Sequence, residues 1–191
     1  MKAVVVLLCT TLAAVPAAVV NNSGFENVNE RTGLPSGWGY TSLPGQSDLV
    51  QYKVTSMSDA KNDKALAITV SKNHPEQRVA YNVFQDIPGI QNGKTYQVSA
   101  RVQTRGLETM PMVVVQCIDQ SGKNFVGFAR TPERQLQQDI KEWESVETKV
   151  TVPEGTARFL IRAGIPSQGN AGGTAILDDI TVTEVENTPA K

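Results

Sequence analysis

The sequence predicts an all-β fold, a sandwich or a barrel, on three observations. Apolar residues recur at every second position in several runs, which is the period of a strand with one buried face. Glycine, proline and asparagine cluster between these runs, where the chain must reverse. No long stretch repeats with the helical period, and only residues 133–141 could form a helical turn, which Pro132 could begin.

Seven runs show the strand alternation, and each is expected to bury one face. The predicted strands cover residues 50–54, 66–70, 96–102, 113–117, 146–152, 159–163 and 176–182. Turn residues separate them at 92–93, 120–122 and 153–155, and in the glycine-rich loop 169–173. In the run 96–102 the apolar positions begin at Tyr96, so Arg101 belongs to the opposite, outer face.

Length and charge limit the function classes. The 191 residues suggest one domain, and 40% hydrophobic residues argue against wholesale disorder. The formal net charge is −1, and no basic stretch alternates with aromatic residues. Because nucleic-acid binding usually requires a basic surface, nucleic acid is not expected as a partner.

The N-terminus has the layout of a secretory signal peptide. Lys2 precedes the apolar stretch 3–15, and small residues follow at a cleavage site near residue 17. We therefore expect a signal peptide at 1–17, a domain at 18–185, a tail at 186–191, and a secreted or periplasmic protein. The alternative is a membrane anchor, for which the apolar run is barely long enough. No later segment is apolar enough to span a membrane, so none is expected in the mature chain.

Cysteine usage predicts a domain without a disulfide. Cys9 would leave with the signal peptide, and Cys117 would be the single cysteine of the mature chain. Cys117 lies in an apolar run and is expected to be a small buried hydrophobic residue. Stability must then come from the apolar core, which is feasible at this length, and a bound metal could add to it.

Several stretches, in this order, resemble a known family. They are Asn-Asn-Ser-Gly-Phe-Glu at 21–26, Leu-Pro-Ser-Gly-Trp at 34–38, the run 83–100, Trp143 with 150–155, and Ala-Ile-Leu-Asp-Asp-Ile-Thr-Val at 175–182. Over residues 21–185 the chain resembles carbohydrate-binding modules of the family 4/9/22 group. That resemblance implies a galactose-binding-domain-like, two-sheet antiparallel jelly-roll β-sandwich. It also implies a non-catalytic protein that holds a poly- or oligosaccharide on its concave sheet.

The resemblance further implies a structural calcium that joins the N-terminal segment to the last strand. Glu26 and Asp178 match the acids of the family's site, and calcium prefers carboxylate and carbonyl oxygens. Simple alternation places Asp178 on the inward face with Ile176 and Ile180, where an unpaired charge is costly. The alternative is that Asp178 accepts backbone N–H bonds or pairs with a lysine or arginine.

Sugars are bound by aromatic rings and by planar polar side chains, and this defines the predicted ligand-binding set. It comprises Tyr81, Arg101, Gln103, Gln116 and Arg162. The alternative for the four polar residues is an ordinary solvated strand face. Trp38 and Tyr40 could form the rim of a binding site, although a tryptophan at such a position more often belongs to the core.

Catalysis is not predicted, and the protein is not expected to be an enzyme. Glu142 and Glu144 alternate with Trp143 on an outer strand face, and no nucleophile elbow, zinc motif or phosphate loop is present. His74 is expected in an exposed loop. The main alternative function is a structural or adhesion β-sandwich of the cell envelope that binds protein, which a large exposed apolar patch would favour. A jelly-roll hydrolase or lyase is a third reading, and the oligomeric state stays open.

Overall fold

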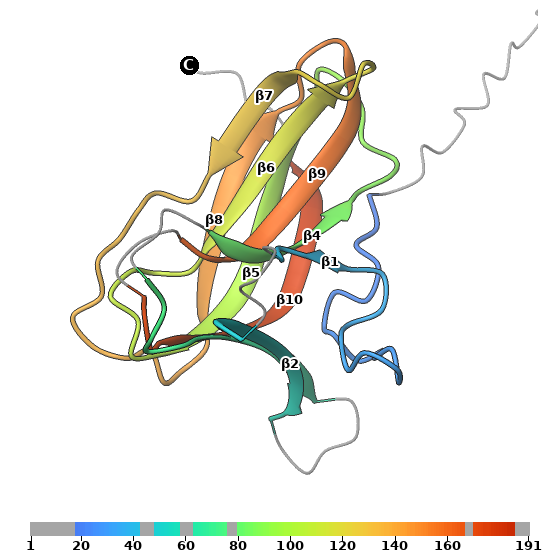
Figure 1. The fold of residues 1–191 in the computed structure, drawn as a ribbon. Helices are drawn as coiled ribbons and strands as arrows, with labels where there is room; N and C mark the ends of the chain where they lie inside the picture. Colours follow the sequence, from blue (N-terminus) through green and yellow to red (C-terminus); the bar gives the residue numbers. More distant parts are fainter. Residues whose placement is uncertain (1–17, 43–47, 58–62, 76–79, 167–169, 186–191) are drawn as a thin grey trace, which may run out of the picture.

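The computed structural model describes residues 18–42, 48–57, 63–75, 80–166 and 170–185 as two packed β-sheets (Figure 1). The strands are β1 (Gly39–Tyr40), β2 (Val50–Ser56), β3 (Lys64–Val70), β4 (Tyr81–Asp86), β5 (Thr95–Arg105), β6 (Met112–Asp119), β7 (Phe125–Arg130), β8 (Glu144–Thr151), β9 (Thr156–Ile165) and β10 (Thr174–Val185). The predicted signal peptide at 1–17 and the tail at 186–191 lie outside the described residues.

Both sheets have five strands and antiparallel pairing. The front sheet has the order β1-β4-β9-β6-β7, and its outer face is turned toward the viewer in Figure 1. The back sheet has the order β2-β3-β10-β5-β8. The predicted two-sheet antiparallel jelly-roll sandwich is confirmed.

The described residues contain no helix, so the helical turn suggested for 133–141 is wrong. This segment instead pairs with the loop before β6. The Met110 N–H donates to the Arg134 carbonyl at 2.8 Å, and the Leu136 N–H donates to the Glu108 carbonyl at the same distance. These bonds to a distant segment hold the backbone extended where a helix would need local bonds.

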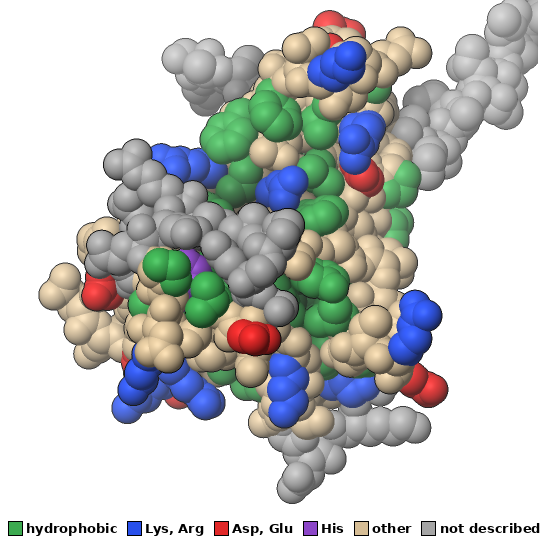
Figure 2. Space-filling model, in the orientation of Figure 1, with side chains coloured by type: hydrophobic (Ala, Val, Ile, Leu, Met, Phe, Trp, Pro, Cys, Tyr) green, Lys and Arg blue, Asp and Glu red, His purple; other side chains and the backbone are tan. Residues whose placement is uncertain are grey.

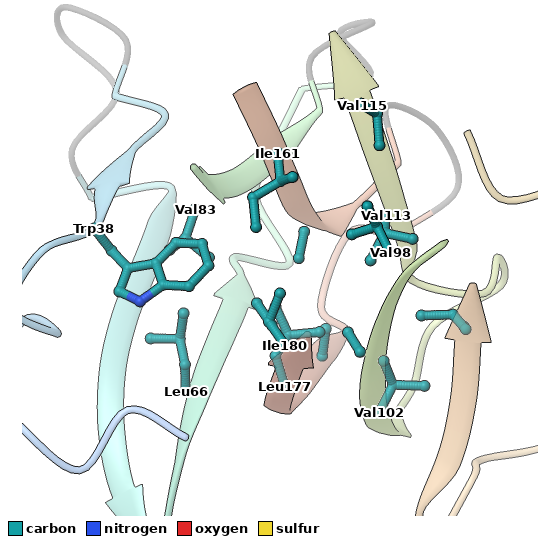
Figure 3. Close-up of a cluster of buried hydrophobic side chains, with 14 of the residues drawn as sticks. Trp38, Leu66, Val83, Val98, Val102, Val113, Val115, Ile161, Leu177 and Ile180 are labelled. Atoms are coloured by element: carbon teal, nitrogen blue, oxygen red, sulfur yellow. The ribbon is translucent and has the colours of Figure 1, made fainter. Parts of the chain in front are cut away.

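The core lies between the sheets (Figure 3). Inward residues of the front sheet, among them Val113, Val115 and Ile161, face Val98 and Leu177 of the back sheet. The alternation predicted for 96–102 is confirmed, since its apolar positions are buried and its polar positions are not. Cys117 is also buried as predicted, and burial raises the pKa of its thiol.

Trp38 belongs to this core and does not form a rim. Its ring packs against Phe25 with 5.5 Å between ring centroids, and its Nε1 donates to the Asn22 carbonyl at 3.1 Å. Both side chains come from the N-terminal segment, which therefore closes one edge of the sandwich (Figure 1). Tyr40, by contrast, is exposed and contacts Tyr52.

A β-bulge in β10 changes the predicted face of Asp178. The register against β5 shifts between Asp178 and Thr181, and Asp179 adopts a positive φ of 47°. Leu177 and Ile180 consequently both join the core, and Asp178 lies on the outer side. The inward placement of Asp178 beside Ile180 is therefore wrong, because simple alternation does not allow for the extra residue.

Asp178 is nevertheless only 9% exposed, because the N-terminal segment covers it. The Ile180 N–H donates to the Ser23 carbonyl at 3.1 Å, which fixes this segment against β10. A Cβ atom at Gly24 would lie 3.4 Å from Asp178 Oδ1, so the chain passes directly over the carboxylate.

Candidate functional site

The outer face of the front sheet carries two rows of side chains that cross its strands. The first row contains Phe84, Arg162, Val114 and Arg130, and the second contains Asp86, Leu160, Gln116 and Phe128. Each row runs from β4 through β9 and β6 to β7. Neighbouring strands are about 4.8 Å apart, so adjacent members of a row are in contact range.

Arg162 is the polar centre of this face. Its Nε donates to Gln116 Oε1 at 3.0 Å, and its Nη1 donates to Asn82 Oδ1 at 3.1 Å. The guanidinium also lies 4.8 Å from the centroid of the Phe84 ring, within the range of a cation–π contact. Burial by these neighbours lowers the pKa of Arg162. Three planar polar groups are thus held in one arrangement before any ligand arrives.

Exposed aromatic rings lie beside this polar centre. Phe125 and Phe128 lie in the edge strand β7, and their side chains are 64% and 57% exposed. A register shift near Cys117 adds one residue to β7, so that Phe125 lies opposite Ile118 and Phe128 opposite Gln116. Both rings therefore lie on the outer side. Figure 2 shows hydrophobic side chains over β6, β7 and β9 with basic side chains among them.

The structure brings together two of the five residues predicted to bind ligand. Gln116 and Arg162 are hydrogen-bonded to each other on the front sheet. Tyr81 faces the core, is 3% exposed, and its hydroxyl lies 2.7 Å from His74 Nε2. It therefore cannot present its ring to a ligand on this face.

Arg101 and Gln103 lie on the outer face of the back sheet, on the opposite side of the molecule. Arg101 forms a 2.8 Å salt bridge with Asp179, and its guanidinium lies 4.7 Å from the centroid of the Trp143 ring. No arrangement of one ligand on one sheet face reaches both these residues and Arg162.

The predicted ligand-binding set omitted three members of this face, Asn82, Phe84 and Phe128. Asn82 and Phe84 alternate with the inward Tyr81 and Val83, so alternation along β4 would have placed both on the outer face. The position of Phe128 depends on the irregular register in β7, which no alternation signal reveals.

Glu26 and Asp178 form a second site, where the N-terminal segment crosses β10. Glu26 Oε1 accepts the Lys64 N–H at 3.0 Å, and Lys64 Nζ donates to the Glu26 carbonyl at 2.7 Å. Asp178 Oδ1 accepts the Asp179 N–H at 2.8 Å. Asp178 thus accepts one backbone N–H bond, as the alternative to a metal predicted. Glu26 Oε2, however, is buried without a hydrogen-bond partner, and an unsatisfied carboxylate oxygen is costly.

The two carboxylates of this site affect each other electrostatically. Burial, together with the charges of Asp179 and Glu26, raises the pKa of Asp178 to about 6. Among the described residues no group of three or more His, Cys, Asp or Glu could hold a metal. A cation here would need backbone carbonyl or water oxygens in addition to the two carboxylates, which suits calcium.

Asp178 should make the metal-free protein less stable as the pH rises. The pKa of Asp178 in the folded protein is about 6, above the ordinary value of 3.8. Ionising this buried carboxyl therefore lowers the free energy of unfolding, beginning near pH 4 and reaching its full effect above pH 6. In EDTA, the Tm of the wild type should fall more between pH 4 and 7 than that of Asp178→Asn. Parallel profiles of Tm against pH for the two proteins would contradict the raised pKa of Asp178.

No protein-family model matches the chain, and no curated protein matches its sequence significantly. Its fold is similar to that of a xylan-binding CBM22 domain from Paenibacillus barcinonensis, with 15% identity, 85% of this chain and 98% of that one covered, and a TM-score of 0.56. A Stig cyclase from Fischerella sp. TAU matches over 92% of this chain and 98% of its own, with 14% identity and a TM-score of 0.61.

The enzymatically active domain of tailspike protein 4 from bacteriophage CBA120 matches 88% of this chain with 20% identity and a TM-score of 0.59. This chain spans only 22% of that protein. Two of these three structures are named as enzymes, so the likeness does not decide whether the fold is catalytic here. Within the described residues no helix is long and apolar enough to cross a membrane. The chain has the jelly-roll fold of the CBM22 and CBM4 carbohydrate-binding modules.

Proposed function

We propose that this protein is a non-catalytic carbohydrate-binding module that holds a poly- or oligosaccharide on the outer face of its front sheet. The observation that carries the proposal is the fixed cluster of Arg162, Gln116 and Asn82 beside exposed phenylalanine rings. Planar polar groups can bind sugar hydroxyls, and the rings can stack on the apolar faces of pyranoses. Preorganised side chains of this kind reduce the entropy lost on binding.

The acids of the front sheet support a binding role over hydrolysis. Its five strands carry two acids, Asp86 and Asp119. Asp86 receives two hydrogen bonds from Arg158, and Asp119 is bonded to Ser121 and Asn124 in the turn after β6. Glycoside hydrolysis generally needs two carboxylates facing each other across the scissile bond. No such pair lies on this face among the described residues.

Two further parts of the proposal concern export and metal. Residues 1–17 would direct the chain out of the cytoplasm, and the mature domain would act there. A structural calcium would be held by Glu26 and Asp178, and its charge would compensate two carboxylates that are close enough to affect each other. This calcium would fasten the N-terminal segment to β10 and would take no part in sugar binding.

The experiment is a glycan-array screen of the purified protein, followed by calorimetric titration with the glycans that bind. Phe128→Ala should weaken binding about 5-fold, because one stacked ring contributes roughly 1 kcal/mol. Arg162→Gln should weaken it at least about 10-fold, since it loses charge-assisted hydrogen bonds. Arg105→Gln, an exposed change on the back sheet, is the matched control and should bind like the wild type.

A folded protein that binds no glycan would contradict the proposal. In that case the exposed Phe125, Val126 and Phe128 would favour the protein-binding alternative, because together they form an apolar patch on an edge strand.

A further inference from the structure

The front sheet has an excess of positive charge that its own acids do not neutralise. Its strands carry three arginines, Arg130, Arg158 and Arg162, and contain no lysine. Arg158 is paired with Asp86, the one acid on the outer face, with Nη2 of the arginine 2.8 Å from Oδ2. Within the described residues, Arg130 and Arg162 therefore have no carboxylate partner.

Arg162 shows the imbalance most clearly, because it is half-buried. Its two hydrogen-bond acceptors are the neutral amides of Gln116 and Asn82. Burying a charge without a counter-charge costs free energy, and an opposite charge on a ligand would recover it. A guanidinium has five N–H donors in a planar fork, and only two of its nitrogens are engaged here. The remaining donors suit the two oxygens of a carboxylate.

Arg130 lies in the same row as Arg162, two strands away, with Val114 between them. At about 4.8 Å per strand, their Cα atoms are roughly 10 Å apart. Phe128 lies two residues before Arg130 on the same face of β7. A sugar ring stacked on Phe128 would thus lie beside both basic groups, and Figure 2 shows basic side chains among hydrophobic ones in this region.

The charge is local and does not belong to the whole molecule. The chain has a formal net charge of −1 and a pI near 5.9, so its overall field does not attract polyanions. A ligand that uses Arg130 and Arg162 must therefore combine negative charge with groups that fit the aromatic and amide side chains next to them.

Resting on the function proposed above, we infer that the glycan is anionic. Carboxylates of uronic acid units would bind Arg162 and Arg130 while the sugar rings contact Phe128. A sulfated glycan offers similar chemistry, but a planar carboxylate matches the fork of a guanidinium with two parallel hydrogen bonds.

The test compares polygalacturonate and alginate with the same polymers after reduction of their carboxyl groups. The wild type should bind the native polymers at least about 10-fold more tightly than the reduced ones, which corresponds to a difference of about 1.4 kcal/mol in binding free energy. Arg162→Gln and Arg130→Gln should each remove most of this preference and reduce the salt dependence of binding. Arg105→Gln on the back sheet should leave the preference for native polymers and the salt dependence unchanged. Thermal unfolding checks that each variant folds.

Each other outcome has a distinct meaning. Equal binding to native and carboxyl-reduced polymers would overturn the inference and leave the proposed glycan binding intact. Binding to carrageenan alone would overturn the carboxylate assignment in favour of sulfate. Equal binding to polyglutamate would show attraction to any polyanion, which also overturns the inference. Binding to no glycan, neutral or charged, would contradict the proposed function itself.

Discussion

Removal of the proposed structural calcium with EDTA should lower the Tm of the protein by about 10 °C. A ligand that binds only the folded state stabilises it by roughly 4 kcal/mol at a thousandfold excess over its Kd. For a chain of this length each kcal/mol changes the Tm by about 2–4 °C. The structural reason is the buried and unpartnered Glu26 Oε2 near the ionised Asp178, whose pKa its surroundings raise.

Differential scanning calorimetry in EDTA and in added calcium measures this effect, and elemental analysis gives the metal content. Asp178→Asn should lose most of the calcium-dependent change in Tm. In EDTA above pH 6 the same variant should be more stable than the wild type, because it removes a buried charge. Glu154→Gln, which removes an exposed carboxylate from the turn after β8, is the matched control and should keep the full response.

An unchanged Tm in EDTA, together with no bound calcium, would contradict the metal proposal. Lys64 would then be the cation that balances this site. Its ammonium group already donates to the Glu26 carbonyl, and its backbone N–H donates to the Glu26 carboxylate.

The sequence predicted the strands in which apolar residues recur at alternate positions, including β10 despite its bulge. β5 is the best case, since its eleven residues alternate between core and surface along the whole strand. The alternating sequence pattern predicts β5 because one face of this strand packs on the core and the other face is partly exposed to solvent. β1, β4 and β7 were missed. The edge strands β1 and β7 have few buried residues and little hydrophobic periodicity, whereas β4 buries residues on both faces and so shows no clear alternation.

Bulges account for the wrong face of Asp178 and for the unexpected position of Phe128. In each case one extra residue reverses the alternation of faces beyond it. In β10 this places Ile180 in the core and Asp178 on the outer face, and in β7 it places Phe125 and Phe128 on the same outer face. Gly127, beside the shift in β7, is consistent with a bulge, but a single glycine in a strand does not fix which residue is the extra one.

The candidate site could be predicted only in part, because alternation does not say which sheet a strand joins. Arg101 and Arg162 have the same local pattern, with a small or apolar inward residue on either side. Their separation onto opposite faces of the sandwich follows from the strand order, which places β5 in the back sheet and β9 in the front sheet. Strand order depends on contacts between residues far apart in the sequence.

Gly164→Ala should be among the most destabilising single substitutions in this protein. Gly164 lies in β9, opposite Asn82 of β4. A Cβ atom at this position would overlap the Tyr81 carbonyl oxygen and lie 2.6 Å from Asn82 Cα. Backbone atoms cannot rotate away as a side chain can, so β4 would have to separate from β9. We expect a loss of about 3 kcal/mol, the upper range for overpacking, and a Tm about 10 °C lower.

Thermal unfolding measures this loss, and Gly122→Ala is its control. Gly122 has a positive φ of 72° but no atom within 4 Å of an added Cβ, so only conformational strain of about 1 kcal/mol is expected. Equal effects of the two substitutions would mean that β4 and β9 do not approach closely at Gly164. The substitution also tests the binding face, because β4 supplies the Asn82 oxygen that holds Arg162. If β4 moves, the preorganised polar cluster is lost, so glycan affinity should fall even at temperatures where Gly164→Ala remains folded.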